Sequence, residues 1–276
     1  MDMTESDLVS KARRAASLFD LKGRVAIVTG GAKGLGEAMA LALAGAGADV
    51  IIAGKTNANN QRVTGEIQSM GRQSLAVTVD VRDPVQVEKM VERAMSELGH
   101  LDILINCAGY ADVKPITEFP LDVWETIMDI NVKGTFLCSQ AAVKPMLAQG
   151  KGKIVNISSL QGFAGRPGDP AYAASKAAVN LMTKSMACEW AKRGICVNAI
   201  APTWCWTDLT APALGHQEFY RKIQERIPAG RAGNKEDLFG ITIFLCSDAS
   251  NFINGAIIPV DGGAIASDGF PLVPVD

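Results

Sequence analysis

Thr29-Gly-Gly-Ala-Lys-Gly-Leu-Gly36 is the stretch of sequence that decides the fold. It follows a short apolar run, residues 24–29, which is typical of a strand buried on both faces. It precedes Glu37-Ala-Met-Ala-Leu-Ala-Leu-Ala44, a segment of strong helix formers. In such a strand–turn–helix unit the glycines let the backbone approach a pyrophosphate, and the helix N-terminus offers free N–H groups. The stretch therefore predicts a dinucleotide-binding fold.

Apolar segments alternate with helical periodicity along the rest of the chain. We expect strands at residues 24–29, 49–53, 74–80, 101–106, 153–158, 195–200 and 256–261. We expect further helices at residues 57–70, 84–98, 120–140 and 170–193. This alternation predicts an α/β fold of the Rossmann type, a doubly wound parallel sheet of about seven strands with helices on both faces.

The length favours one large domain. A chain of 276 residues with 48% hydrophobic and 20% charged residues is typical of a soluble globule. We predict an N-terminal extension, residues 1–20, and a single dinucleotide-binding domain, residues 21–276. Within the extension, residues 8–19 either form one amphipathic helix packed on the body or a neighbour, or fray. The apolar tail, residues 268–276, either reaches a neighbouring subunit or frays.

Charge and cysteine usage exclude several classes of protein. A net charge of −2 leaves no global basic field for nucleic acid or anionic lipid. We see no secretory signal and no long apolar segment, so we expect a cytoplasmic protein with no nucleic-acid and no membrane partner. The six cysteines form no Cys-x-x-Cys pair, and His100 and His216 are isolated, so we expect reduced thiols and no metal.

Glycines and polar residues gather at the predicted strand ends. In a doubly wound sheet, ligands bind at the carboxyl ends of the strands. We expect the adenine to lie where residues 80–81 end the third strand. The cofactor contacts that we predict at these ends are Gly30, Lys33, Gly34, Leu35, Gly36, Gly54, Lys55, Asp80, Val81, Asn106, Ala108, Gly109, Pro202 and Thr203.

The end of the second strand bears on the choice of cofactor. Many NAD-binding folds have an acid there that binds the ribose hydroxyls, but this chain has Ala53-Gly-Lys-Thr56. The missing carboxylate, together with Lys55 and Lys33, leaves space and positive charge for a 2′-phosphate. The alternative is that either lysine is merely solvated. We favour NADP over NAD.

Tyr172-Ala-Ala-Ser-Lys176 carries candidate chemistry. A tyrosine and a lysine four residues apart on a helix lie on the same face. An ammonium beside a phenol favours the phenolate and lowers the phenol pKa from about 10 toward the working range. By itself the pattern is weak, because an exposed helical pair has the same spacing.

Taken together, these motifs resemble the short-chain dehydrogenase/reductase family, in its compact single-domain branch. Thirteen residues separate Ser159 from Tyr172, which is the family's usual interval, and the resemblance covers about residues 20 to 265. The matching motifs are Thr29-Gly-x-x-x-Gly-x-Gly36, Asn106-Cys-Ala-Gly109 (the family usually has Asn-Asn-Ala-Gly), Asn131, Ser159, Tyr172-x-x-x-Lys176, Thr207 and Asp261-Gly-Gly263.

The resemblance implies an NAD(P)-dependent oxidoreductase that transfers hydride between nicotinamide and a secondary alcohol or ketone. Tyr172 would be the general acid/base, and Ser159 would bond the same substrate oxygen. Lys176 would hold the nicotinamide ribose and lower the pKa of Tyr172, so Tyr172 and Lys176 also count as cofactor contacts, with Thr207. Asn131 would anchor a water chain for protons. The resemblance also implies a homotetramer.

Two serines compete for one role. Ser158 immediately precedes Ser159, and the thirteen-residue interval selects Ser159. Ser158 is then expected to serve the end of the strand. A similar choice applies to Cys205, which lies closest to the proposed chemistry: packing is a simpler role for it than catalysis.

The substrate side departs from the family. Pro202-Thr203 replaces the usual Pro-Gly, and the bulky Trp204-Cys-Trp206 follows. The two tryptophans either line an apolar pocket or pack against the sheet. We expect residues 208–228 to form a flexible helical cover over the substrate. The substrate contacts that we predict are Ser159, Gln161, Phe163, Tyr172, Trp204 and Trp206.

The sequence only narrows the substrate. Residues 98–105 and 227–233 are similar to gluconate and deoxygluconate dehydrogenases, which favours a sugar acid or a polyol, whereas the tryptophans favour a bulkier ketone. Arg166, Arg221 and Lys222 either receive a substrate carboxylate or are solvated. A 3-oxoacyl reductase is the alternative enzyme. A non-catalytic NADP-sensing protein is the alternative of another class, and the four residues of the proposed catalytic set argue against it.

Overall fold

The computed structural model describes residues 5–267, so the predicted role of the tail, residues 268–276, lies outside the described part. A seven-stranded sheet with the order β3-β2-β1-β4-β5-β6-β7 forms the centre, and every neighbouring pair is parallel. This confirms the predicted doubly wound fold. The strands are β1 (Val25–Thr29), β2 (Asp49–Gly54), β3 (Ser74–Thr78), β4 (Ile103–Asn106), β5 (Gly152–Ile157), β6 (Ile195–Pro202) and β7 (Ile257–Val260).

The position of β1 creates the ligand crevice. Every residue of β1 is buried, as its apolar run predicts for a strand covered on both faces. Val28 of β1 pairs with Ile52 of β2 on one side and with Ile105 of β4 on the other. The chain therefore moves outward in opposite directions from β1 and β4. The connections after these two strands lead to helices on opposite faces of the sheet, and this arrangement forms a crevice at the carboxyl edge.

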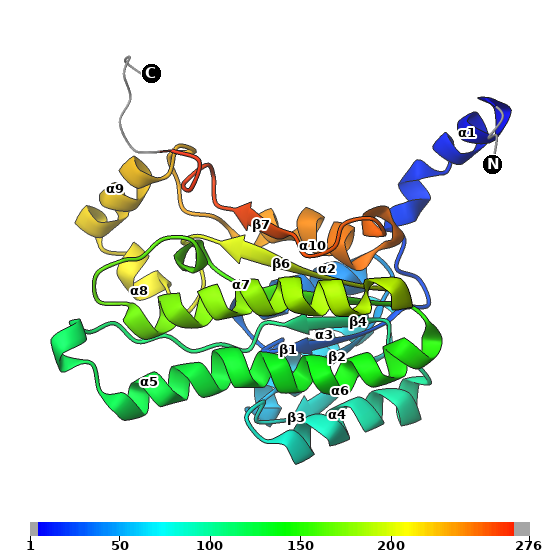
Figure 1. Ribbon diagram of the computed structural model, residues 1–276, viewed down its shortest axis with the longest axis horizontal. Helices are drawn as coiled ribbons and strands as arrows, with labels where there is room; N and C mark the ends of the chain where they lie inside the picture. Colours follow the sequence, from blue (N-terminus) through cyan, green and yellow to red (C-terminus); the bar gives the residue numbers. More distant parts are fainter. Residues whose placement is uncertain (1–4, 268–276) are drawn as a thin grey trace.

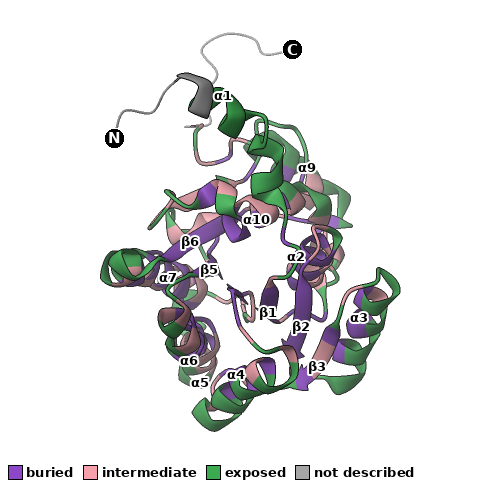
Figure 2. Cartoon of the chain, turned by 90° about the vertical axis from the view of Figure 1, so that its right-hand side faces the viewer, coloured by how far each residue is buried: buried purple, intermediate pink, exposed green. Residues whose placement is uncertain are grey.

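Helices cover both faces of the sheet (Figure 1). One face is covered by α2 (Gly34–Gly45), α3 (Asn57–Ser69) and α10 (Phe239–Cys246). The other is covered by α4 (Pro84–Leu98), α6 (Gly134–Gln149) and α7 (Pro170–Trp190), and α5 (Leu121–Met128) leads into α6. Figure 2 shows the buried residues concentrated on the strands and on the inner sides of these helices. No helix among residues 5–267 is long and apolar enough to cross a bilayer.

The helix predicted at residues 120–140 is interrupted, which corrects the sequence analysis. A π-helical turn, η3 (Asp129–Lys133), separates α5 from α6, and α6 continues to Gln149. A π turn inserts an extra residue into the helix and changes which side chains face inward, and such turns are frequent at functional sites. Asn131 lies in this turn and is buried.

The N-terminal segment also differs from expectation. Instead of one helix over residues 8–19, the chain forms α1 (Glu5–Ala12) and a separate 3-10 turn, η1 (Ala15–Phe19). Phe19 contacts Phe244 of α10, with ring centroids 6.2 Å apart, so η1 lies on the body, whereas α1 projects away from it (Figure 1). Leu8 and Val9 on α1 are exposed. The division of the chain at residue 20 remains a prediction.

Short helices complete the fold. The predicted cover contains α8 (Ala211–Leu214) and α9 (Gln217–Arg226), which lie on the side toward which the arrowheads of β6 and β7 point (Figure 1). The remaining 3-10 turns are η2 (Ile116–Glu118), η4 (Leu160–Gly162), η5 (Ala191–Arg193), η6 (Lys235–Leu238) and η7 (Asp248–Ser250).

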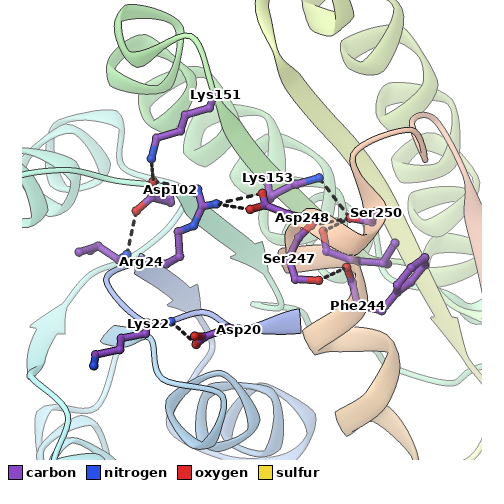
Figure 3. A network of polar contacts seen from close by, with 12 residues as sticks. Asp20, Lys22, Arg24, Asp102, Lys151, Lys153, Phe244, Ser247, Asp248 and Ser250 are labelled. Atoms are coloured by element: carbon purple, nitrogen blue, oxygen red, sulfur yellow. Dashed lines mark hydrogen bonds and ion pairs between the residues drawn. The ribbon is translucent and has the colours of Figure 1, made fainter. Parts of the chain in front are cut away.

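A buried carboxylate joins the amino ends of three central strands (Figure 3). Asp102, just before β4, accepts a hydrogen bond from the backbone N–H of Val25 at 3.0 Å. Its carboxylate also lies 3.1 Å from the Lys151 ammonium and 3.5 Å from the Arg24 guanidinium. Arg24 in turn pairs with Asp248 of η7 at 2.9 Å. This cluster lines a cavity of about 580 Å³ at the sheet edge opposite to the crevice.

The two faces of α4 provide a matched test of this packing. Val87 is 1% exposed in the core, whereas Val85 on the same helix is 56% exposed. We expect Val87→Ala to lower the free energy of unfolding by about 2 kcal/mol, because two buried methyl groups and their contacts are lost. Val85→Ala makes the same change in helix propensity and should stay within about 0.5 kcal/mol of wild type. Urea unfolding measures both, and equal effects would contradict the assigned register of α4.

Candidate active site

The glycine turn after β1 is a bare-backbone cradle. Gly30 has a φ of +65°, and a Cβ built there would lie 2.9 Å from the backbone of Ala108. A Cβ on Gly36 would lie 2.2 Å from the carbonyl oxygen of Gly30. Neither position accepts a side chain, so the turn packs tightly against α2 and against the loop after β4. The sequence analysis predicted both positions as cofactor contacts, and this close approach is what a pyrophosphate cradle requires.

Thr29 holds the two loops of the crevice together. Its Oγ1 accepts hydrogen bonds from the backbone N–H groups of Cys107 at 3.2 Å and Ala108 at 3.3 Å. The same hydroxyl donates to the carbonyl of Ile105 at 3.3 Å. Thr29 belongs to the glycine motif but was not predicted as a site residue. The feature of the sequence that could have identified it is a hydroxyl at the end of a buried apolar strand.

The start of α2 fits a dinucleotide phosphate. Lys33 precedes the helix in extended conformation and makes no side-chain cap, and Leu35 in the first turn packs on the apolar core. A Cβ on Gly34 would lie 3.7 Å from Thr207, so this predicted cofactor contact lies next to the glycine turn. A helix N-terminus with free N–H groups and no carboxylate cap favours a bound anion. The residues present here therefore fit the cofactor.

The end of β2 differs from expectation in one respect. Gly54 ends the strand, and Lys55 follows it, but the Lys55 ammonium lies 3.1 Å from the carboxylate of Asp80. Asp80 also pairs with Arg82 at 2.6 Å, and this guanidinium holds the pKa of Asp80 far below its usual range. Lys55 is thus part of a group of two cations and one anion, which keeps a surplus positive charge. The side chain of Val81, which was also predicted as a contact, is buried in the core.

Asn106 turns its side chain inward. Its Nδ2 donates to Ser139 of α6 and to Asn156 of β5, both at 2.9 Å. Asn156 then donates to Thr183 of α7 at 2.9 Å. The amide predicted as a cofactor contact is therefore a buried brace between the sheet and two helices, and the backbone of residues 106–109 borders the crevice.

Asn131 joins the crevice loop to α7. Its Oδ1 accepts from the backbone N–H of Tyr110 at 2.8 Å, and its Nδ2 donates to the Tyr110 carbonyl at 3.0 Å. The same Nδ2 donates to the hydroxyl of Ser175 at 2.9 Å. The π turn aims this amide at both partners. Ser175 was missed in the sequence, although it lies within the Tyr-x-x-x-Lys motif.

Ser159, Tyr172 and Lys176 meet at the carboxyl edge of β5. Ser159 follows this strand and is 8% exposed, and its hydroxyl acts on the Tyr172 phenol, whose pKa it lowers. The Lys176 ammonium lies 5.4 Å from the centroid of the Tyr172 ring and donates to the carbonyl of Ile157 at 2.7 Å. A Cβ on Gly109 would lie 3.9 Å from that ammonium. The structure thus joins these three side chains to the crevice loop.

Burial dominates the titration of this group. It raises the pKa of Tyr172 to about 12, although the hydrogen bond with Ser159 opposes this, and it lowers the pKa of Lys176 to about 8. From the sequence we expected Lys176 to lower the pKa of Tyr172; in this structure burial raises that pKa, and the charge that opposes the rise is that of Arg166. A phenol that keeps its proton at neutral pH is suited to donate it to a carbonyl oxygen.

The neighbouring serine has a different role. The Ser158 hydroxyl donates to Oδ1 of Asn180 on α7 at 2.5 Å and is buried. Asn180 completes this brace by donating to the carbonyl of Gly162 at 3.1 Å. Ser158 therefore fixes α7 to the end of β5, as expected, and leaves the neighbouring position to face the crevice.

The two tryptophans pack on the cover rather than on the sheet. Trp204 meets Phe219 of α9 edge-on, with ring centroids 5.1 Å apart, and Trp206 lies 5.6 Å from Tyr220 of the same helix. Both tryptophans stay partly exposed. Cys205 between them is buried, and burial raises its thiol pKa to about 11, which favours packing over catalysis.

The remaining predicted contacts lie on two loops. Pro202 ends β6, and Thr203 lines a cavity of about 210 Å³ with residues 260–262. Gln161 lies in η4, and its Oε1 is buried without a hydrogen-bond partner in the described chain. Phe163 is exposed. Among residues 5–267, no group of three or more His, Cys, Asp or Glu side chains is arranged to hold a metal ion.

Ser158 and Ser159 allow a catalytic role and a structural role to be tested separately. We expect Ser159→Ala to lower kcat at least about 100-fold with little change in the melting temperature, because the hydroxyl that we expect to orient the reacting oxygen is lost. Ser158→Ala should do the reverse, lowering the free energy of unfolding by about 1–3 kcal/mol because it leaves Asn180 without its donor. Steady-state kinetics and thermal unfolding distinguish the variants, and a larger kinetic loss in Ser158→Ala would exchange their roles.

Comparison with known proteins places the chain in a family. A family model described as enoyl-(acyl carrier protein) reductase matches residues 30–264. The chain is 43% identical to 2-dehydro-3-deoxy-D-gluconate 5-dehydrogenase of Escherichia coli (strain K12), over 91% of this chain and 98% of that protein. It is 38% identical to gluconate 5-dehydrogenase of Gluconobacter oxydans (strain 621H), over 91% and 98%.

A solved structure gives the same result in three dimensions. Gluconate 5-dehydrogenase from Burkholderia cenocepacia J2315, in complex with NADP and tartrate, superimposes with a TM-score of 0.88 and 36% identity. The match covers 91% of this chain and 99% of that one. These relatives are named as dehydrogenases, and the match covers nearly their whole length. The chain belongs to the short-chain dehydrogenase/reductase family.

Proposed function

We propose that the protein is an NADP-dependent oxidoreductase that interconverts a secondary alcohol and a ketone on a sugar acid. The observation that carries the proposal is the grouping of Ser159, Tyr172 and Lys176 at the same sheet edge as the glycine cradle. A protein that only sensed the cofactor would need the cradle but not these three side chains together.

The roles that we propose follow from the positions of the side chains. Bound NADP would supply hydride exchange at its nicotinamide ring. Tyr172 donates its phenolic proton to the substrate oxygen on reduction and accepts a proton from it on oxidation. Ser159 hydrogen-bonds the same oxygen and orients it. Lys176 holds the ribose side of the site, and Asn131 keeps the crevice loop in register with α7 while a water chain connects Lys176 to solvent.

The cofactor is NADP in this proposal. The end of β2 has no carboxylate to bind ribose hydroxyls and instead has Lys55 within a group of surplus positive charge. Lys33, in the glycine turn, immediately precedes α2. A 2′-phosphate would neutralise this surplus. The remaining contacts of the proposed set are Gly30, Gly34, Leu35, Gly36, Gly54, Asp80, Val81, Asn106, Ala108, Gly109, Pro202, Thr203 and Thr207.

The substrate class is inferred from the relatives together with the site. Several relatives at 35–43% identity are named for 2-dehydro-3-deoxygluconate, gluconate or 5-ketogluconate. A solved relative contains tartrate, which is itself a hydroxy acid. The proposed contacts of the substrate are Ser159, Gln161, Phe163, Tyr172 and Trp204, with Trp206 supporting the cover.

We also propose a cytoplasmic homotetramer. Two apolar side chains are strongly exposed on neighbouring helices of one face, Leu121 on α5 and Leu181 on α7. Phe136 on α6 is exposed on the same face. Large exposed apolar side chains on adjacent helices favour burial against another subunit. The cysteines of the described chain are all unpaired, in keeping with a reducing compartment.

Removal of the phenolic hydroxyl tests the proposed reaction. We expect Tyr172→Phe to lower kcat for NADPH-dependent reduction of 5-ketogluconate at least about 100-fold, because the proton donor is lost. The affinity for NADPH, measured by energy transfer from tryptophan, should change less than about threefold. Retention of wild-type turnover by Tyr172→Phe would refute the mechanism. Reduction of a carrier-linked 3-oxoester in preference to 5-ketogluconate would refute the substrate class.

The cofactor preference has its own test. We expect Lys55→Met to weaken NADPH binding about tenfold and to leave NADH binding unchanged, because only NADPH carries a 2′-phosphate for the ammonium. Lys89→Met, an exposed lysine on α4, is the matched control for loss of surface charge. Equal weakening of NADPH and NADH, or a preference of the wild-type protein for NADH, would contradict this role of Lys55.

A further inference from the structure

One arginine is held rigidly beside the substrate side of the site. Arg166 lies in the loop between η4 and α7, and its Nη2 donates to Oδ2 of Asp169 at 2.6 Å. Its guanidinium carbon lies 5.1 Å from the centroid of a Trp204 ring. The Arg166 side chain is 34% exposed, and its other N–H groups have no hydrogen-bond partner in the described chain. The guanidinium is therefore held by Asp169 and by the Trp204 ring, and its remaining N–H groups are available to a ligand.

The residues that hold Arg166 belong to the reaction site. Asp169 is 1% exposed and immediately precedes α7, three residues before Tyr172. Its charge acts to raise the pKa of Tyr172, and the charge of Arg166 acts to lower it. Trp204 follows the end of β6 by two residues and packs on α9 of the cover. The guanidinium is thus within electrostatic reach of the phenol, between the fixed wall of the site and its cover.

The other two candidate cations are engaged elsewhere. Arg221 on α9 is 67% exposed and pairs with Glu225 at 3.3 Å, one turn away on the same helix. Lys222 is 63% exposed and pairs with Glu218 at 3.3 Å in the same manner. Exposed pairs of this kind leave long side chains mobile in water and hold no fixed geometry. Of the three cations considered in the sequence, only Arg166 presents an ordered planar group.

We propose that Arg166 is the receptor for the substrate carboxylate, with Asp169 and Trp204 as the residues that position it. This assignment rests on the proposed function, because it names the group that distinguishes a sugar acid from a neutral polyol. A guanidinium binds a carboxylate through parallel N–H groups, and stacking on an indole fixes the plane in which they point. A carboxylate held at Arg166 then sets which carbon of the sugar acid reaches Tyr172 and Ser159.

D-Gluconate and D-glucitol are matched probes, since they differ only in a carboxylate or a hydroxymethyl group at one end. We expect Arg166→Met to lower kcat/KM for NADP-dependent oxidation of D-gluconate about 10- to 100-fold more than for D-glucitol, the size of a charge-assisted hydrogen bond, because loss of the Arg166 charge beside Tyr172 acts on both probes alike. Arg166→Lys should keep part of the preference, because it retains the charge but not the planar fork. Arg193→Met, an exposed arginine in η5, is the control and should change neither rate.

Calorimetric titration of D-gluconate and D-glucitol in the presence of NADPH separates this inference from the proposed reaction. Binding of D-gluconate that is lost in Arg166→Met supports the receptor even if neither probe is oxidised, an outcome that would refute the proposed function alone. Oxidation of D-gluconate at the wild-type rate by Arg166→Met would refute the receptor and leave the reaction intact. Equal losses of kcat/KM for both probes in Arg166→Met would also overturn the assignment of the receptor. Loss of the preference for D-gluconate in Arg221→Met, with the preference kept in Arg166→Met, would overturn it as well.

Discussion

The contact between the backbone of Gly30 and the backbone of Ala108 is the constraint on which the rest of the site depends. It brings the turn after β1 against the loop after β4 with no room for a side chain between them. The crevice at the sheet edge exists because β1 and β4 lead away in opposite directions, and Thr29 hydrogen-bonds the two loops across it. A methyl group at Gly30 would force these loops apart, and the phosphate cradle would separate from the floor on which the nicotinamide side is built.

Buried polar groups, rather than apolar packing alone, set the position of α7. Asn131 reaches this helix through Ser175, Ser158 reaches it through Asn180, and Asn156 reaches it through Thr183. Each bond has a preferred direction, so the three together fix both the rotation and the translation of the helix that carries the reactive tyrosine and lysine. The cover is held differently, by aromatic contacts between the segment after β6 and α9, which tolerate sliding. The reactive groups are therefore preorganised, while α9 retains freedom to move over the tryptophans.

Much of this arrangement was predictable because it depends on local patterns. Apolar runs and helical periodicity located the seven strands, and the spacing of Ser159, Tyr172 and Lys176 located the group that the structure brings together. The π turn at Asn131 was not predictable, because one inserted residue leaves the apolar periodicity of the flanking helices almost unchanged. The pairing of Lys55 with Asp80 joins two strand ends that lie far apart in the sequence, and the pKa of Tyr172 depends on burial, which exists only after folding.

The carboxylate of Asp102 lies at the amino ends of the central strands, on the side of the sheet away from the crevice, and stabilises the same strands there. It connects Val25, Arg24 and Lys151 at the points where β1, β4 and β5 begin, and it touches none of the reactive groups. The amino ends of the strands thus carry a stabilising cluster of charges, and their carboxyl ends carry the reactive groups. Because Asp102 and its partners lie apart from the reactive groups, substitutions at the carboxyl ends of the strands can change the substrate without loosening the cluster that stabilises the open sheet.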